Sequence, residues 1–319
     1  MLSILIPTYN RASDLKKNLK ILISQIQSQS LADKIKISVS NNCSTDSTSE
    51  VIQDIISSTD LEINLYEQSD NIGLEANALF LLEKSHDDYI MYLGDDDFLP
   101  EGYLSYVLKH IEQTPDLSCI IPGFSALFPD GHVEASRDAD FEELLSLASF
   151  KTVMTFSQFG HQLSGLCLRR QGLYETYTAT PTLRNIYLFV FFVTYSNYHG
   201  TTVYAPKYQV LVSQGNSKDW KYDDSGLLTE IFKNYKIVFK DSYIKRNIMN
   251  FVFMNQQIWR LRVGIDFKTT YLSFMSLQKD PNLDLLTKLL LPFYYLYLYL
   301  RGRFLRVKKE LKKIKLFKY

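Results

Sequence analysis

The fold is decided by residues 89–97, which read Tyr-Ile-Met-Tyr-Leu-Gly-Asp-Asp-Asp. An apolar and aromatic run leads directly into three adjacent aspartates, which is the pattern of a buried strand whose carboxyl end reaches the surface. Carboxylates this close repel one another by about 1 kcal/mol or more per pair, so a cation or open water must offset the charge. The stretch therefore predicts either a metal site or a solvated acidic turn.

The three acids are expected to divide into two kinds. In an extended segment the side chains at i and i+2 point the same way, so Asp95 and Asp97 share a face and Asp96 points elsewhere. Mg²⁺ or Mn²⁺ is usually held by one or two carboxylates and completes its shell with substrate phosphate oxygens. Asp95 and Asp97 are therefore the predicted metal ligands.

Short apolar runs alternate with helical patterns through the first half of the chain. Strands are predicted at 2–7, 36–40, 63–66, 89–93, 119–122 and 163–168, with one or two more within 202–213. Helices are predicted from a cap at Ser13 to about 26, at 47–57, 74–85, 100–113 and 183–198, and as a short helix within 137–148. This order predicts an α/β fold with a mixed, mainly parallel, Rossmann-like sheet flanked by helices.

Strand patterns become scarce after about Leu227. Helical periodicity instead covers 227–241, 244–264 and 269–278. We therefore predict a first domain at 1–220 and an α-helical C-terminal region at 221–319.

The end of the chain carries a concentrated positive charge. Residues 301–319 hold nine Lys or Arg against the single acid Glu310, although the whole chain has 35 residues of each sign. The uncharged segment 289–300 is too short to span a bilayer, and its tyrosines favour the bilayer interface. A basic amphipathic helix from about Arg303 would lie on an anionic bilayer surface.

We therefore predict that residues 289–319 bind the anionic inner face of the cell membrane. A C-terminal core helix with a solvated basic end is the alternative. Nucleic acid is not an expected partner, because no recognition motif accompanies the charge. Three scattered cysteines without C-x-x-C spacing and the lack of a recognisable secretory signal favour a cytoplasmic protein, peripherally associated with the membrane.

Polar loops follow three of the predicted strands, where ligands bind in parallel α/β sheets. These loops are Thr8-Tyr9-Asn10-Arg11, the segment from Asn41 to Asp46, and Gly94 to Asp97, with the turn Asn71-Ile72-Gly73 between the last two. In this order the motifs resemble the nucleotide-sugar domain of family 2 glycosyltransferases of the GT-A fold, over roughly residues 1–125. The loop after the second strand resembles that of the abequosyltransferase-like enzymes of bacterial surface-polysaccharide assembly.

The resemblance implies an inverting glycosyltransferase that uses Mn²⁺ or Mg²⁺ and moves a sugar from a nucleoside-diphosphate sugar to a hydroxyl of a glycan acceptor, which we expect to be lipid-linked. Residues 1–220 would then form the nucleotide-sugar-binding and catalytic domain. The implied nucleotide-sugar contacts are Pro7, Thr8, Tyr9, Arg11, Asn41, Asn71, Gly73, Asp95 and Asp96, with the metal on Asp95 and Asp97.

One departure from the family pattern concerns the nucleotide base. Many members carry an Asp that pairs with a uracil or thymine at the position that Asn41 occupies here. A carboxamide both donates and accepts hydrogen bonds, so UDP, TDP and CDP sugars all remain candidate donors.

A second departure concerns the catalytic base. Inverting members place an acidic pair about a hundred residues after the D-x-D motif, where this chain has Thr180-Pro181-Thr182-Leu183-Arg184. His161 and Glu175 flank the predicted strand 163–168 and are the leading candidates to deprotonate the acceptor hydroxyl. Further candidates are His199, Asp138, Asp140 and Glu142.

Two other classes of protein remain possible on the sequence. A sugar-nucleotide nucleotidyltransferase also combines such a sheet with metal-binding acids, but it should show a Gly-rich phosphate loop where this chain has Pro7 to Arg11. A non-catalytic GT-A scaffold subunit would explain the missing acidic pair.

Overall fold

The computed structural model describes residues 1–135, 140–180, 185–215 and 228–316, with side chains described as far as residue 302. The chain separates into two compact units, Met1–Ser217 and Lys218–Tyr319. The domain boundary expected from the sequence lies three residues later, between 220 and 221.

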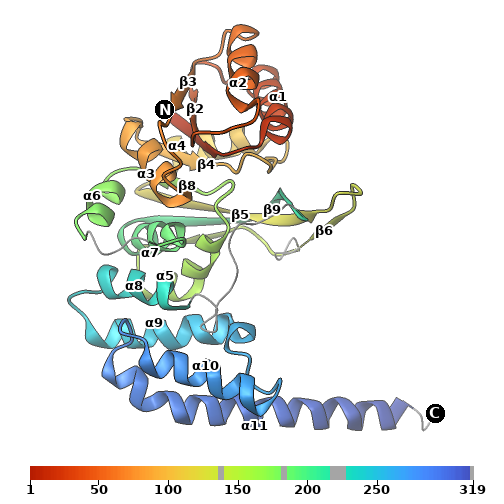
Figure 1. Cartoon of the computed structure of the whole chain (residues 1–319), viewed down its shortest axis with the longest axis vertical. Helices are drawn as coiled ribbons and strands as arrows, with labels where there is room; N and C mark the ends of the chain where they lie inside the picture. The colour runs from red at the N-terminus through yellow and green to blue at the C-terminus, as the bar shows by residue number, and fades with distance from the viewer. Residues whose placement is uncertain (136–139, 181–184, 216–227, 317–319) are drawn as a thin grey trace. The chain divides into compact units, whose positions relative to one another are not determined.

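A single mixed sheet forms the centre of the first unit (Figure 1). Its strands are β1 (Leu2–Thr8), β2 (Ile35–Asn41), β3 (Ile63–Glu67), β4 (Tyr89–Tyr92), β5 (Leu117–Leu127), β6 (Val133–Ala135), β7 (Leu144–Ser146), β8 (Cys167–Arg169) and β9 (Thr201–Ser213). Along the sheet the described strands follow the order β3-β2-β1-β4-β8-β5-β9-β7, and β6 pairs with β5. β1 pairs in parallel with β2 and with β4. The carboxyl ends of these three strands therefore meet at one edge.

Helices cover the sheet of the first unit. They are α1 (Ala12–Ser28), α2 (Thr48–Ser57), α3 (Leu74–Lys84), α4 (Tyr103–Gln113), α5 (Phe150–Phe156), η1 (Ser157–His161), α6 (Leu173–Thr178) and α7 (Leu188–His199). α1 packs beside α2, and α3 packs on β1 and β2 (Figure 1). α1 buries Leu15, Leu19, Leu22 and Ile26, as its spacing predicts. Every residue of β1 is buried, as in a strand covered on both faces.

The fold class predicted from the sequence is confirmed, but several elements were wrongly assigned. The helix predicted within 137–148 was wrong in the part the structure describes, because Leu144–Ser146 pairs as β7 with the edge of β9. Strand pairing here overrides helical propensity. The strand predicted at 163–168 is shorter in the structure and lies at Cys167–Arg169. Residues 183–184 of the helix predicted at 183–198 lie outside the described residues.

Two predicted helix starts were also wrong. α4 begins at Tyr103 rather than Pro100, because Pro100 to Gly102 form a turn in which the Tyr103 amide donates to the Pro100 carbonyl. Gly102 has a φ of 77°, which breaks the helix geometry at that point. α1 begins at Ala12, and its first amide donates to Asp46 Oδ2 instead of to a cap from Ser13.

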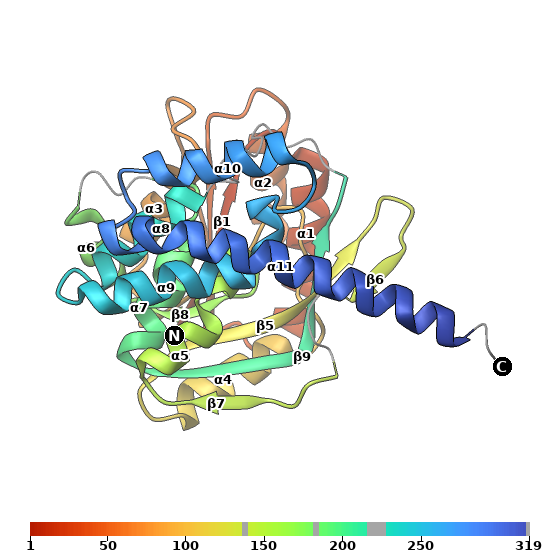
Figure 2. The same cartoon turned by 90° about the horizontal axis from the view of Figure 1, so that it is seen from below.

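The second unit is helical in all its described elements. They are α8 (Leu228–Val238), α9 (Tyr243–Gln256), η2 (Ile258–Leu261), α10 (Phe267–Lys279) and α11 (Leu285–Leu316). α9 and α10 both pack against α11, which runs on past their ends (Figure 2). The helix predicted at 244–264 ends early, because Gln257 leaves the helical conformation and the chain continues as the separate short helix η2.

The helix predicted to begin near Arg303 was also wrong, since α11 is continuous from Leu285 and contains Pro292. Proline cannot donate to the carbonyl four residues earlier, which is that of Lys288. The Gln278 side-chain amide donates to the Lys288 carbonyl at 2.8 Å. Among the described residues, the hydropathy of the helices falls short of what a membrane-crossing segment requires.

Candidate active site

The loop after β1 meets the acidic turn after β4. The Thr8 hydroxyl donates to Asp95 Oδ2 at 2.7 Å, and the Leu93 amide donates to the Leu5 carbonyl. Both contacts follow from the parallel pairing of β1 with β4, which carries the two loops to the same edge of the sheet. The structure thus brings together Thr8 and Asp95, two residues that the sequence assigned to the nucleotide-sugar site.

The three aspartates do not lie on an extended segment, so the argument that Asp95 and Asp97 share a face was wrong in its premise. The Asp97 amide donates to the Gly94 carbonyl, which closes a turn. A Cβ at Gly94 would lie 2.8 Å from Asp97 Oδ2 and 3.1 Å from Ser164 Oγ, so a larger residue would displace the side chains that hold the turn. Side chains of a turn diverge, and each of the three carboxylates therefore has its own surroundings.

Asp97 points into the protein and is 5% exposed. Its Oδ1 accepts the Ser213 amide at 2.9 Å, and its Oδ2 accepts the Ser164 hydroxyl. The Ser164 hydroxyl oxygen in turn accepts the Gly94 amide at 2.9 Å. The Asp97 carboxylate is thus already engaged in joining the acidic turn to β9 and to the segment before β8.

Asp95 is held in an environment that disfavours its charge. Burial raises the pKa of Asp95 to about 7; the Thr8 hydroxyl acts in the opposite direction, Asp96 raises the pKa further, and Arg11 lowers it. A carboxylate in such surroundings gains most from a nearby cation. The turn therefore has the electrostatic character expected of a cation or diphosphate–metal site.

Asp96 is half-buried and lines a cavity of about 310 Å³. The same cavity is lined by Asp14 and Lys17 of α1 and by Ser213 at the end of β9. The Ser213 hydroxyl donates to the Asp96 carbonyl, which holds the backbone of the turn against β9. Asp96 is therefore the acid of the turn that faces an open volume.

The loops after β1 and β2 are bonded to one another. The Thr45 amide donates to Asn10 Oδ1 at 2.7 Å, and the Asn10 amide donates to Ser44 Oγ at 2.9 Å. Asn10 has a φ of 52°, a conformation that asparagine tolerates better than most residues. Tyr9, the residue directly after β1, is half-buried.

Two other residues predicted to contact the nucleotide, Pro7 and Arg11, have neighbours within β1, β2 and α1. Pro7 lies buried inside β1, opposite Ser40 of β2. The Arg11 guanidinium lies 3.8 Å from Asp14 Oδ2, within α1 and its cap. Arg11 is partly exposed, and its positive charge lowers the pKa of Asp95 in the acidic turn.

Asn41, expected to read the base, is buried within its own loop. Its amide group donates to Ser49 Oγ at 2.8 Å and to Glu67 Oε2 at 2.9 Å, while its oxygen accepts the Ser44 amide at 3.2 Å. Glu67 is exposed and lies opposite Asn41 in the β2–β3 register. The carboxylate of Glu67 is thus a polar group at this edge that the sequence interpretation missed.

Asn42 fixes the turn between β3 and α3. Its amide donates to Asn71 Oδ1 at 2.8 Å, and its oxygen accepts the Ile72 amide at 2.9 Å. Gly73 follows with a φ of 83° and open space around its Cα. The structure therefore brings Asn71 and Gly73 to the same edge as Asn41 and Thr8.

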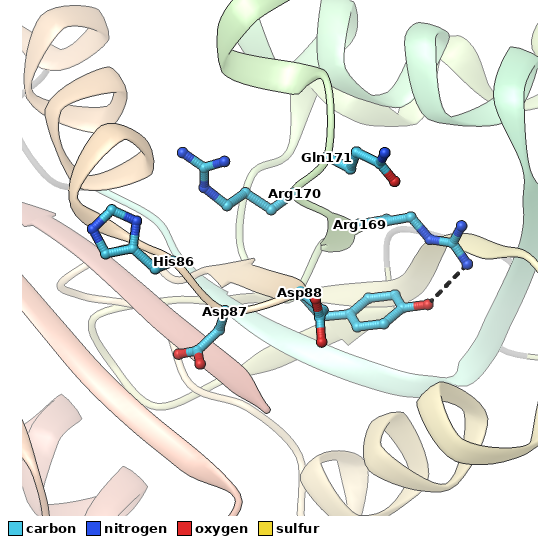
Figure 3. Close-up of a pocket in the computed structure, with 7 residues that line it drawn as sticks. His86, Asp87, Asp88, Arg169, Arg170 and Gln171 are labelled. Carbon is cyan, nitrogen blue, oxygen red and sulfur yellow. Dashed lines mark hydrogen bonds between the residues drawn. The ribbon is translucent and has the colours of Figure 1, made fainter.

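Glu175, one of the two leading candidates for the base, pairs with Arg170 at 3.6 Å. Arg170 lines a cavity of about 440 Å³ together with His86, Asp88 and Arg169, beside the amino end of β4 (Figure 3). In Figure 3 the guanidinium groups of Arg169 and Arg170 point away from each other, so they do not converge on one anion. The structure thus places the ion partner of Glu175 at the opposite end of β4 from Asp95.

His161, the other leading candidate, ends η1 and is exposed. Its Nδ1 lies 2.6 Å from the Gln158 carbonyl. Three residues later, Ser164 contacts both Gly94 and Asp97. The segment that carries His161 is therefore bonded directly to the acidic turn.

The remaining base candidates have other surroundings. His199 ends α7, with Nδ1 2.8 Å from the Tyr195 carbonyl. Asp140 and Glu142 lie exposed before β7. Asp138 and residues 181–184 lie outside the described residues.

Sequence reasoning missed the groups that support the site. Ser164 and Ser213 hold Asp97, and neither belongs to a recognisable motif. Only the parallel pairing of β2 with β3 could have drawn attention to Glu67 from the sequence.

The model of the family described as Glycosyl transferase family 2 matches residues 3–177, more than half of the chain. The chain belongs to glycosyl transferase family 2. The matched range contains the acidic turn, the loops after β1 and β2, and both leading base candidates.

Two curated relatives resemble part of this chain. Abequosyltransferase RfbV of Salmonella typhimurium is 30% identical over 118 residues, which cover 37% of the chain and 34% of the relative. A GalNAc(5)-diNAcBac-PP-undecaprenol beta-1,3-glucosyltransferase of Campylobacter jejuni is 32% identical over 108 residues, covering 34% and 33%. The chain thus spans about a third of the length of each of these relatives.

Solved structures resemble the family 2 chain over more of its length. TarS 1-349 of S. aureus, in complex with UDP-GlcNAc, has a TM-score of 0.65 at 11% identity, covering 87% of this chain and 79% of that one. Mannosyltransferase PcManGT of Pyrobaculum calidifontis, in complex with GDP-Man and Mn²⁺, has a TM-score of 0.52 at 13% identity, covering 94% and 86%. At these identities the likeness establishes the fold.

Proposed function

We propose that this chain transfers a sugar, with inversion, from a nucleoside-diphosphate sugar to a hydroxyl of a lipid-linked glycan in bacterial surface-polysaccharide biosynthesis. The observation that carries the proposal is the hydrogen bond between Thr8 and Asp95, which joins the acidic turn to the loops after β1 and β2. The names of the two curated relatives support a surface-glycan substrate. One is an abequosyltransferase, and the other acts on an undecaprenol-linked glycan.

The donor would bind across the loops at the carboxyl ends of β1, β2 and β4. Tyr9 offers an aromatic face for the base, and the turn at Gly73 leaves open space beside its backbone. Glu67, rather than Asn41, has a side chain that reaches solvent at this edge. A carboxylate accepts hydrogen bonds from the N3–H of uracil or thymine or from the amino group of cytosine, so UDP, TDP and CDP sugars remain the candidate donors.

A divalent ion fits the acidic turn, because Asp95 is a half-buried acid whose pKa desolvation raises toward neutrality. Asp95 and Asp96 would hold Mn²⁺ or Mg²⁺. Asp97, the second ligand expected from the sequence, instead uses both carboxylate oxygens for Ser213 and Ser164. When bound, the ion supplies Lewis-acid neutralisation of the diphosphate leaving group.

The acceptor hydroxyl requires a base, and the contacts favour His161 over Glu175. Ser164 bonds the segment of His161 to the acidic turn, whereas Glu175 pairs with Arg170 near the amino end of β4. An imidazole that takes the hydroxyl proton during in-line displacement supplies the function of the missing acidic pair.

Membrane association would come from residues 289–319. Leu289, Phe293 and Leu296 of α11 are 61%, 70% and 56% exposed, and the basic residues follow in sequence. Apolar side chains beside Lys and Arg are typical of an interfacial helix on anionic lipid. We propose that the protein works at the cytoplasmic face of the membrane.

The test begins with a thermal-shift panel of UDP, TDP, CDP and GDP sugars, each with and without Mn²⁺. Binding to the folded state raises the Tm by mass action, so the true donor should stand out. Transfer to a lipid-linked acceptor is then measured with the selected donor for the wild type, Asp95→Asn and His161→Gln, with Glu175→Gln as the control. Loss of transfer in the first two variants alone supports the proposal.

Other outcomes contradict it. Release of pyrophosphate from a nucleoside triphosphate and a sugar phosphate would identify a nucleotidyltransferase. Donor binding without hydrolysis or transfer onto any acceptor would identify a non-catalytic subunit. Loss of transfer in Glu175→Gln with full activity in His161→Gln would reverse the assignment of the base.

A further inference from the structure

A cavity of about 440 Å³ lies within the C-terminal unit, far along the sequence from the acidic turn. Apolar side chains from η2, from the loop after it and from α11 form most of its lining, among them Trp259, Ile265 and Leu298. Two guanidinium groups, Arg262 and Arg301, complete it. Its volume lies in the range of about 300–1,000 Å³ that is typical of small-molecule sites.

Two residues with positive φ and two hydrogen bonds to Thr270 fix the backbone beside the cavity. Arg262 and Gly264 have φ values of 52° and 83°, which turn the chain sharply after η2. The Thr270 hydroxyl donates to the Arg262 carbonyl at 3.3 Å, and its oxygen accepts the Gly264 amide at 3.2 Å. α10 therefore holds the loop that carries Arg262 and Ile265.

The charge around the cavity is positive. Residues 228–302 contain eleven Lys or Arg and five Asp or Glu. Most of these five acids have partners in the helices: Asp266 caps α10 through the Thr269 amide at 2.7 Å, and Asp284 pairs with Arg246 at 3.0 Å. Asp280 accepts the Thr229 hydroxyl. Arg262 and Arg301 both line the cavity, and no Asp or Glu is among the described residues that line it.

Large apolar side chains stand exposed around the mouth of this cavity. Of the lining residues, Trp259 is 58% exposed and Ile265 is 70% exposed. Exposed apolar groups of this size in one place mark a binding surface. Tryptophan beside arginine is the combination found where proteins meet the interface of a bilayer.

We propose that this cavity binds an anionic glycerophospholipid, with the headgroup phosphate on Arg262 and Arg301 and the upper part of an acyl chain against Trp259, Ile265 and Leu298. Guanidinium groups match phosphate oxygens in geometry and charge, and the apolar lining matches the chain. The inference rests on the membrane association in the proposed function and deepens it. It gives that association a specific lipid site that does not depend on residues 303–319.

The experiment uses the fluorescence of Trp259 in the full chain. The chain has two tryptophans, so a Trp220→Phe background leaves Trp259 as the reporter. Vesicles of phosphatidylcholine, with and without phosphatidylglycerol, carry brominated acyl chains that quench a tryptophan inserted among them. We expect quenching with phosphatidylglycerol vesicles and little with phosphatidylcholine alone.

Charge removal tests the two arginines. Arg262→Gln with Arg301→Gln should weaken partition onto phosphatidylglycerol vesicles about thirtyfold, since each of the two basic residues near an anionic surface contributes about 1 kcal/mol. The matched control, Lys240→Gln with Lys279→Gln, removes the same charge from exposed positions outside the cavity lining. The control should change partition much less. If the double arginine variant fails to fold, quenching of Trp259 in the protein that keeps both arginines still tests the lipid site.

Three results would overturn the inference. The first is vesicle binding without quenching of Trp259, together with an equal loss of partition in the two double variants. It would show that the protein binds membranes without using the cavity. Stronger protection from quenching by farnesyl phosphate than by short-chain phosphatidylglycerol would make the occupant an isoprenoid phosphate. Failure of the full chain to bind vesicles would remove both the lipid site and membrane association, while sugar transfer in detergent would still report on the proposed enzyme activity.

Discussion

The Thr8 hydroxyl donates to Asp95 Oδ2 at 2.7 Å, across two strands that are parallel neighbours. Thr8→Val removes this donor while keeping the shape of a side chain that is 3% exposed. We expect the unfolding free energy to fall by about 1 kcal/mol and transfer to fall about tenfold, because the Asp95 carboxylate loses the bond that favours its charged form. Thermal unfolding and a Mn²⁺ titration of transfer measure the two effects.

Thr8→Ser is the matched control, since it keeps the hydroxyl. It should retain most of the activity. Equal losses in Thr8→Val and Thr8→Ser would show that the methyl group, and not the hydrogen bond, is what matters at this position.

Asp96 and Asp97 should separate into a ligand and a structural acid. Asp97→Ala leaves the Ser213 amide and the Ser164 hydroxyl without their acceptor in a buried place, which should cost about 2–4 kcal/mol of stability. Asp96→Asn should change stability by less than about 0.5 kcal/mol, as at a surface position, but weaken the Mn²⁺ dependence of transfer. Thermal unfolding and activity at graded Mn²⁺ distinguish them. An Asp97→Asn protein with a normal Tm and no response to Mn²⁺ would restore Asp97 as a metal ligand.

The sequence predicted the sheet and the helices of the first half well, because β1, β2 and β4 are short apolar runs between polar loops and α1 repeats its leucines at spacings of three and four. It predicted less of the site. Whether Asp97 points outward depends on the turn at Gly94 and on Ser164, which lies far along the chain and reaches Asp97 only through strand pairing. Local patterns carry no information on such contacts.

Asn41, which the resemblance led us to expect at the nucleotide base, illustrates the same limit. Asn41 occupies the expected position at the end of β2, but its amide group is bonded to Glu67 of β3. Asn41→Asp, which restores the residue that many family members carry, would put two carboxylates where a donor and an acceptor now meet. We expect a loss of about 1–2 kcal/mol from repulsion and the lost bond. Thermal unfolding should show recovery when Glu67→Gln is added. Full stability of Asn41→Asp alone would contradict the contact.

Asp46 caps two helices at once, since its Oδ2 accepts the Ala12 amide and its Oδ1 accepts the Thr48 amide, both at 3.1 Å. Burial acts to raise the pKa of Asp46, but the hydrogen bonds from Thr48 and Ala12 outweigh it and set the pKa below the ordinary value of 3.8. A depressed pKa means that the folded state binds fewer protons, so this stabilisation is present above about pH 4 and is lost as pH falls through the folded-state pKa.

Asp46→Ala should therefore lower stability by about 1 kcal/mol at pH 7, the usual cost of losing a helix cap, and by less at pH 3. Thermal unfolding at the two pH values measures the difference. Asp60→Ala, at an exposed position after α2, is the control and should have little effect. An equal loss at both pH values would assign the effect of Asp46 to something other than its charge.

The Gln278 side chain donates the hydrogen bond that the backbone of Pro292 cannot donate. Its side chain donates to the Lys288 carbonyl at 2.8 Å, the group that an ordinary residue at 292 would bond within α11. Gln278→Ala should cost about 1 kcal/mol, because the carbonyl loses its partner. In a Pro292→Ala background the backbone amide of residue 292 satisfies the same carbonyl, so Gln278→Ala should cost clearly less. A double-mutant cycle on thermal unfolding measures this coupling, which we expect at about 0.5–1 kcal/mol. Equal costs in the two backgrounds would show that Gln278 acts through packing alone.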